Sequence, residues 1–167
     1  HASVRKILES RRYGEMTNLI EIDISYTSVA SIPSSWGMIQ NLTSLRLRGS
    51  QVRNVPWAVV TLSSLETFDV QGAPCASSMD WSGGALDSGT INSKVKAELI
   101  KSLKRIDISQ NSLRQVPSWM EDFATLKRLD FSGNNMTRFE GSSFLGRRDV
   151  FLVGGNPIVE ARLQDTT

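Results

Sequence analysis

The sequence predicts an α/β solenoid of about six 22-23-residue repeats, with a curved parallel β-sheet and 3₁₀/helical return segments. Three observations predict it. One apolar frame recurs along the chain, and apolar residues within each copy alternate as they do in a strand. Ile-Pro or Val-Pro pairs then follow three of the copies, where the chain has to turn back.

The recurring frame has apolar residues at i, i+3, i+5 and i+10 and a small residue at i+8. Its copies begin at Leu19, Leu42, Leu65, Leu103, Leu126 and Arg148. Of 24 apolar places 23 are apolar, against about ten expected from the 40% apolar content, and Arg148 alone fails. The starts are 23, 23, 38, 23 and 22 residues apart, so one common period carries a single insertion.

Each copy contains a short predicted strand. Residues i+3 and i+5 are two apart and therefore share the buried face, while i+2, i+4 and i+6 point to solvent. One strand per repeat in a constant direction stacks into a parallel sheet. In the first return segment Ile32, Trp36 and Ile39 follow at three- or four-residue steps, which predicts helical or 3₁₀ turns that pack back on the sheet. We therefore expect Trp36 to be structural.

The residue at i+8 lies where the chain leaves the strand. An Asn there can bond neighbouring backbone groups and tolerates unusual turn geometry. Asn111, Asn134 and Asn156 fit this role. Thr27 and Ser50 can supply part of the bonding and Ala73 cannot, so we expect the first half to be less regular.

Six segments of the chain resemble the leucine-rich repeat. They are LIEIDISYTSV, LTSLRLRGSQV, LETFDVQGAPC, LKRIDISQNSL, LKRLDFSGNNM and RDVFLVGGNPI. The resemblance covers roughly residues 16 to 159 in six registered copies. It implies a solenoid that binds another protein along its concave sheet, as the recognition segment of a larger receptor-like or scaffold protein. Peptide or carbohydrate binding on the same face, and a purely structural spacer, are the alternatives.

Three parts of the chain follow from this frame. Residues 1-18 form an N-terminal cap or the tail of a preceding repeat, and residues 19-159 form the repeat array. Residues 160-167 are a C-terminal tail. The array has an insertion at about 76-93, rich in Ser and Gly, which is either a tolerated loop or a partner contact. Val150 and Leu152 place apolar groups on the solvent side of the last strand.

Composition excludes several function classes. The 167 residues carry a formal net charge of +2, which does not indicate nucleic-acid binding, and no apolar run approaches the length of a membrane span. One cysteine and one histidine, His1, cannot build a disulfide framework, a serine-hydrolase triad or a multi-histidine metal site. Asp107 and Asp130 could resemble a glycosidase pair, but no pocket or apolar wall accompanies them. We expect no enzyme, no cofactor, no metal and no membrane contact by this segment.

The predicted partner site combines charged side chains of the strands' solvent face with two aromatic anchors, Tyr26 and Trp81. Its charged residues are Glu21, Asp23, Arg46, Arg48, Asp69, Arg105, Asp107, Arg128 and Asp130. Some aspartates at i+4 are also expected to belong to the scaffold. The partner is a protein or peptide ligand, whose identity the sequence leaves open together with the oligomeric state.

Two sequons, at Asn41 and Asn135, predict possible glycosylation at the surface. Their placement is similar to that in receptor-like leucine-rich repeat ectodomains and favours an extracellular or cell-surface location. The 23-residue period with Ile-Pro or Val-Pro also resembles intracellular members, so a cytoplasmic location stays open.

Overall fold

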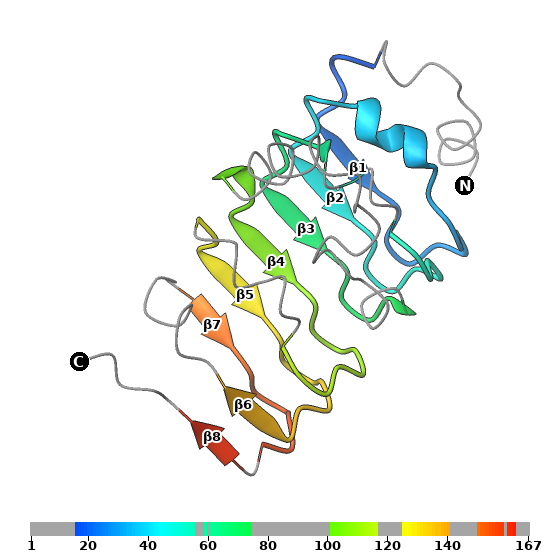
Figure 1. Cartoon of the computed structure of the whole chain (residues 1–167). Helices are drawn as coiled ribbons and strands as arrows, with labels where there is room; N and C mark the ends of the chain where they lie inside the picture. The colour runs from blue at the N-terminus through cyan, green and yellow to red at the C-terminus, as the bar shows by residue number, and fades with distance from the viewer. Residues whose placement is uncertain are drawn as a thin grey trace, which may run out of the picture.

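Six short strands, one from each repeat, lie side by side in one parallel sheet (Figure 1). In order across the sheet they are β1 (Glu21–Asp23), β2 (Ser44–Arg46), β3 (Thr67–Asp69), β4 (Arg105–Asp107), β5 (Arg128–Asp130) and β7 (Val150–Leu152). Each strand occupies positions i+2 to i+4 of its repeat. The register joins equivalent residues of neighbouring repeats throughout, for example Ile22 with Leu45 and Leu129 with Phe151. The predicted solenoid is confirmed.

This computed structural model describes residues 16–55, 59, 61–74, 101–116, 125–140, 150–158 and 160–162. For strand residues 139, 140, 150 and 160–162 the description covers the backbone alone. The insertion at 76–93 with Trp81, and all but the last three residues of the predicted 1–18 cap, lie outside the described residues.

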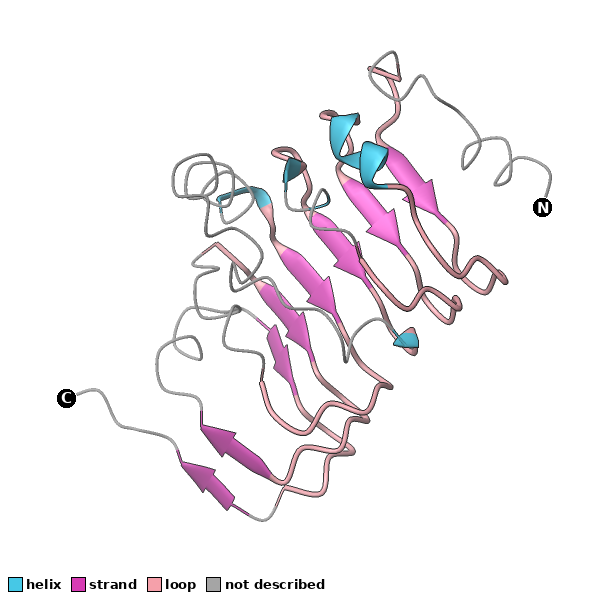
Figure 2. Ribbon diagram, turned by 45° about the vertical axis from the view of Figure 1, so that its right-hand side comes forward, coloured by secondary structure: helices cyan, strands magenta, loops and turns pink. Residues whose placement is uncertain are grey.

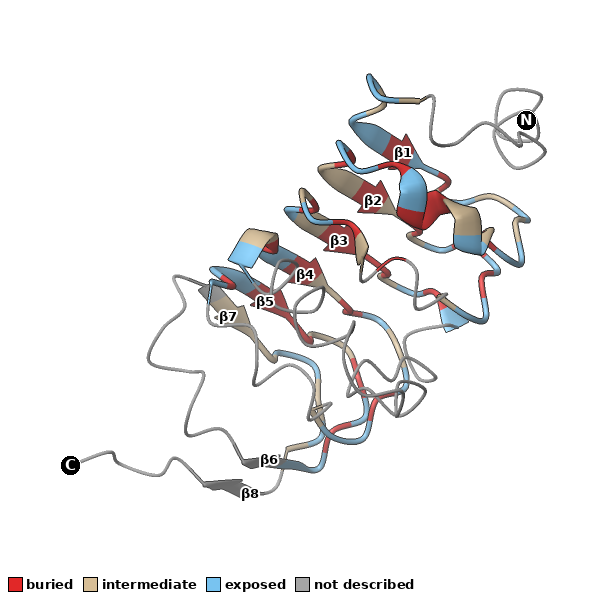
Figure 3. Cartoon of the chain, turned by 45° about the horizontal axis from the view of Figure 1, so that its top comes forward, coloured by how far each residue is buried: buried red, intermediate tan, exposed pale blue. Residues whose placement is uncertain are grey.

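The core lies under the sheet and is built from the predicted inward positions (Figure 3). Leu45, Phe68 and Leu129 at i+3 are fully buried, as are the leucines at i in repeats two to four. Phe131 and Phe151 carry the core toward the last repeat in an edge-to-face contact with ring centroids 6.0 Å apart. At about 25 cal/mol per Å² of buried apolar surface, this continuous core supplies the main force that joins the repeats.

The return segments contain little regular helix, and Figure 2 shows short cyan turns beside the magenta strands. The 3₁₀ helix η2 (Ser34–Met38) begins after Pro33 and buries Trp36 completely. Trp36 is therefore structural, as predicted.

A second, two-stranded parallel sheet joins the last two repeats on the return side. It pairs β6 (Arg138–Glu140) with β8 (Glu160–Arg162), and β8 begins just beyond residue 159, where the predicted array ended. Three earlier repeats have proline at the equivalent place, as at Pro33, and proline has no N–H for a ladder. The absence of proline at Glu140 and Arg162 explains why strand pairing occurs here.

Position i+7 adopts the left-handed conformation in every repeat. The six residues are Tyr26, Gly49, Gly72, Gln110, Gly133 and Gly155, with φ between 54° and 70°. The backbone N–H at this position continues the ladder, since Tyr26 N donates to Arg48 O at 2.7 Å and Gln110 N donates to Ser132 O at 2.8 Å. Glycine adopts this conformation freely, whereas Tyr26 and Gln110 pay about 1 kcal/mol each. The first half of the array was expected to be less regular, but its strands and turns repeat as closely as those of the second half.

Candidate functional site

The sheet side chains at i+2, i+4 and i+6 form the face opposite the core, here called the open face. It corresponds to the predicted concave face. The structure places ten of the eleven predicted partner-binding residues on it or at its edge. Glu21 and Asp23 lie on β1, Arg46 on β2, Asp69 on β3, Arg105 and Asp107 on β4, and Arg128 and Asp130 on β5, while Tyr26 and Arg48 follow β1 and β2. Trp81 lies outside the described residues.

The aspartates at i+4 hold the strand ends. In each case Oδ1 accepts the backbone N–H two residues further on: Asp23 from Ser25 at 2.8 Å, and Asp69, Asp107 and Asp130 from Gln71, Ser109 and Ser132 at 3.0 Å. This is the local side-chain-to-backbone bond typical of Asx turns. Asp69 and Asp130 are only 6% and 8% exposed. One oxygen of each of these carboxylates therefore stabilises the fold itself, as was expected for some of the aspartates at i+4.

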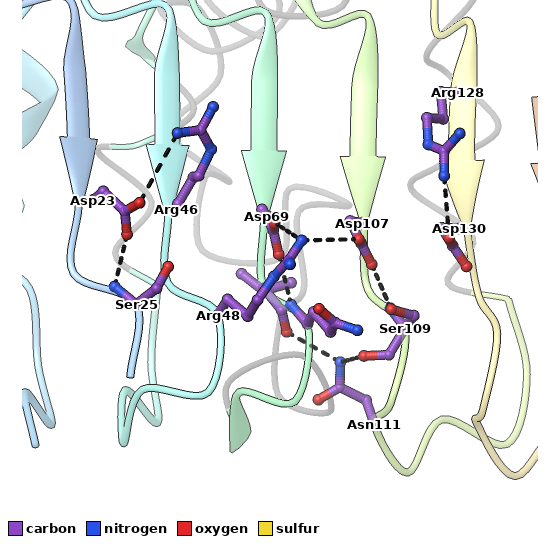
Figure 4. A network of polar contacts seen from close by, with 12 residues as sticks. Asp23, Ser25, Arg46, Arg48, Asp69, Asp107, Ser109, Asn111, Arg128 and Asp130 are labelled. Carbon is purple, nitrogen blue, oxygen red and sulfur yellow. Dashed lines mark hydrogen bonds and ion pairs between the residues drawn. The ribbon is translucent and has the colours of Figure 1, made fainter. Parts of the chain in front are cut away.

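Arg48 ties three repeats together. Its Nη2 donates to Asp69 Oδ2 at 2.6 Å and lies 3.6 Å from Asp107 Oδ2, so the side chain reaches from repeat two across β3 to β4 (Figure 4). The hydrogen bond to Asp69 is the first cause of a raised pKa for Arg48, against the opposing effect of burial. Because Asp69 is almost fully buried, Arg48 supplies its counter-charge.

Arg46 makes the equivalent connection to the first repeat. Its Nη1 donates to Glu21 Oε1. The same Nη1 lies 3.9 Å from Asp23 Oδ2 (Figure 4). Burial alone would raise the pKa of Asp23, but hydrogen bonds from Ser25 and the charges of Arg46 and Arg48 outweigh it, and the pKa is lowered. The open face of the first three repeats thus largely neutralises itself.

Arg105 and Arg128 lie in a different environment. They are register neighbours on β4 and β5, and both are exposed. Within the described residues the Arg105 side chain has no hydrogen bond or ion pair, while that of Arg128 faces Asp130 of its own strand, with Nη2 and Oδ2 3.6 Å apart. Adjacent strands are about 4.8 Å apart, so two forked donors lie close together without a shared counter-ion.

Leu152 borders this arginine pair. It is the register neighbour of Asp130 and half-buried, while the residues on either side of it, Phe151 and Val153, pack against the core. Alternation therefore turns Leu152 to the open face. Its apolar character was visible in the sequence, but it was not predicted as a site residue.

Tyr26 lies at the edge of the open face and is 73% exposed. Its ring covers Gly49 of the next repeat so closely that a Cβ there would lie 2.7 Å from Tyr26 Cδ1. A side-chain hydrogen bond with Tyr26 also contributes to the raised pKa of Arg48. The Tyr26 side chain is thus held in place by Arg48 and Gly49 of the next repeat, which suits a rigid contact residue.

The Asn ladder lies at the turn that leaves the strand. Asn134 Nδ2 donates to Phe131 O at 2.8 Å and to Ile108 O of the preceding repeat at 3.0 Å, and its Oδ1 accepts the N–H of Leu113. Asn111 and Asn156 also bond to the preceding repeat. Among the described residues, the side chains of Thr27 and Ser50, at the same position, bond only within their own repeats.

Both sequon asparagines are exposed. Asn41 Nδ2 donates to Thr17 O at 2.5 Å. Glycosylation at either site stays a prediction. Within the described ranges, no cluster of three potential His, Cys, Asp or Glu metal ligands occurs, and no helix has the length and apolarity that crossing a bilayer requires.

No protein-family model matches the sequence, and a search of curated proteins found no match. Among solved structures, the chain is similar to a leucine-rich repeat protein of Leptospira interrogans, with 22% identity and a TM-score of 0.67. That alignment covers 91% of this chain and 34% of the other, so this chain spans about a third of the Leptospira protein's length. A second match is the leucine-rich repeat ectodomain of the plant membrane receptor kinase GASSHO1/SCHENGEN3 from Arabidopsis thaliana, solved in complex with Casparian strip integrity factor 2. It has 16% identity and a TM-score of 0.43 over 82% of this chain and 19% of that one. The likeness to the Leptospira protein shows that this chain has the leucine-rich repeat fold.

Proposed function

We propose that this chain is a protein-recognition module that binds a protein or peptide partner across its open face, as the recognition segment of a larger receptor-like or scaffold protein. The observation that carries the proposal is the pair Arg105 and Arg128. Their guanidinium groups are exposed, adjacent and only weakly neutralised within the described chain. Charged groups that the fold does not use are available for recognition in trans.

The geometry of the face supports a macromolecular partner. A sheet of six strands about 4.8 Å apart is some 24 Å wide, which suits a chain segment laid across it. Tyr26 lies at one end of this face, and the arginine pair with Leu152 lies at the other. An aromatic anchor and arginines are the residue types most often responsible for binding energy at protein interfaces.

Site-specific photo-crosslinking tests which face binds. A photoreactive amino acid is placed at Thr67 or Ser132 on the open face, and at Asn54 or Gln115 on the return side as the matched control. Substitutions at Arg46 or Arg48 are unsuitable as a first test because both residues hold internal ion pairs. We expect covalent capture of a partner from the open-face positions. Capture from the return-side positions, or from neither pair, would contradict the proposal.

A further inference from the structure

We propose that the partner segment that lies over β4, β5 and β7 is acidic and carries an apolar residue next to its acidic ones. This inference rests on the function proposed above and specifies the chemistry of the partner. It follows from the distribution of charge along the open face, because the cationic side chains that the scaffold leaves available lie over the same few strands.

The arginine pair is the first observation. Arg105 and Arg128 are at i+2 of consecutive repeats, in direct register, and their guanidinium forks are matched to carboxylates. Lys104 is exposed, but its Nζ lies 2.5 Å from Glu66 Oε1. The guanidinium group of Arg105 has no hydrogen bond or ion pair within the described residues.

The two nearby carboxylates cancel this charge only in part, since Asp130 Oδ2 lies 3.6 Å from Arg128 Nη2 and the Arg105 side chain has no ion pair among the described residues. Asp107 and Asp130 each direct Oδ1 to a backbone N–H, and their side chains are only 24% and 11% exposed. Asp107 Oδ2 also faces Arg48, 3.6 Å away. An incoming carboxylate therefore meets the arginine forks before it meets these acids.

The i+2 column shows why an acidic segment fits here and not elsewhere on the face. From β1 to β7 the column consists of Glu21, Ser44, Thr67, Arg105, Arg128 and Val150. The side chains of this column change from acidic on β1 through neutral on β2 and β3 to basic on β4 and β5, and the column ends with an apolar residue on β7. Arg46 and Arg48, the other arginines of the face, are bound to Glu21 and Asp69.

Leu152 is the residue that the apolar side chain of the partner would contact. It lies on the strand beyond Arg128 as the register partner of Asp130, so Leu152 and Arg128 are diagonal neighbours, about 7–8 Å apart. In an extended peptide, side chains on one face are about 6.6 Å apart, two residues apart in sequence. A segment that crosses the strands can therefore place an acidic residue over Arg128 and an apolar residue, two positions away, over Leu152.

The test is a selection of displayed random 12-residue peptides against the whole chain. The same selection is run against R105E/R128E and against the matched control R53E/R114E, which reverses two exposed arginines at i+11, away from the strands. The wild-type chain and the control are expected to enrich peptides with Asp or Glu and an apolar residue two positions away. R105E/R128E is expected to enrich basic peptides instead. Circular dichroism of this variant is the check that the chain is still folded.

The milder variant R105Q/R128Q keeps the experiment decisive if charge reversal unfolds the chain. It is expected to weaken binding of the best acidic peptide about tenfold, as the loss of two solvent-exposed charge pairs predicts. A selection with no acidic bias, one that enriches nothing, or a peptide insensitive to R105Q/R128Q would overturn the inference. If the selected peptides are not acidic but crosslink to Thr67, the proposed function holds and the acidic partner alone is wrong.

Discussion

The first and second halves of the array join their repeats with different side chains. In repeats one to three, Arg46 and Arg48 form ion pairs with acids of neighbouring repeats on the open face. In repeats four to six, Asn111, Asn134 and Asn156 bond to the preceding repeat at the turn below the strands. Neighbouring repeats are therefore joined by ion pairs on the open face in the first half and by Asn hydrogen bonds at the turn after the strand in the second half.

This difference has a consequence for binding. Where the Asn ladder connects the repeats, the open-face arginines make no ion pair to a neighbouring repeat among the described residues, and Arg105 and Arg128 remain exposed. Where Thr27, Ser50 and Ala73 replace asparagine, the arginines are used for cohesion. The position of the ladder thus determines which part of the face has free charge.

The largest effect is expected from the ladder itself. Asn134→Ala removes three hydrogen bonds, each worth about 1 kcal/mol, and leaves the buried N–H of Leu113 without a partner, so the unfolding free energy should fall by about 3 kcal/mol. Ser50→Ala, at the equivalent place in repeat two, should cost only about 0.5 kcal/mol because Ser50 bonds within its own repeat. Urea unfolding measures both. Equal losses would remove the distinction between the halves.

Double-mutant cycles compare the two arginine–aspartate pairs. The Arg48→Gln and Asp69→Asn cycle should give a coupling energy of about 1 kcal/mol, because Asp69 is buried and its bond to Arg48 is 2.6 Å long. The Arg128→Gln and Asp130→Asn cycle should give about 0.3 kcal/mol, since the atoms are 3.6 Å apart and Arg128 is exposed. A larger coupling for the second pair would show that Arg128 is also a structural residue.

The smallest effect concerns the two non-glycine residues at i+7. Gln110→Gly should raise stability by about 0.5 kcal/mol, because relief of the left-handed strain at φ 56° exceeds the loss of the exposed, polar Gln110 side chain from its contact with Gly133. Tyr26→Gly should give no gain, since the relief is offset by loss of the ring contact with Gly49 and the bond to Arg48. Thermal unfolding separates the two, and a gain from Tyr26→Gly would mean that its ring does not stabilise the turn.

Much of the fold could be predicted from the sequence because each strand is defined twice, by alternation within a repeat and by spacing between repeats. Ile106 at i+3 and Ile108 at i+5 are both buried as the frame requires. The β6–β8 sheet was missed, although the loss of proline at Glu140 was visible. The left-handed turns were missed too, despite glycine at four of the six i+7 positions.

The site was less predictable because the roles of its residues depend on distances between repeats. The sequence placed Arg48 and Arg105 on the same face as equivalent candidates. It could not show that Arg48 reaches across β3 to Asp107. This contact joins residues on either side of the insertion, where the repeat starts at Leu65 and Leu103 are 38 residues apart. Only the three-dimensional arrangement separates a bound arginine from an available one.

The most direct test of this division is the unfolding free energy of two charge-removed pairs, R46Q/R48Q and R105Q/R128Q, measured side by side in urea. Each variant loses two positive charges from the open face. The first should be destabilised by about 2 kcal/mol and the second by less than about 1 kcal/mol, because the first removes the 2.6 Å bond from Arg48 to buried Asp69, whereas Arg128 lies 3.6 Å from Asp130. Equal destabilisation of both, or the reverse order, would contradict the claim that the second half of the face is reserved for binding.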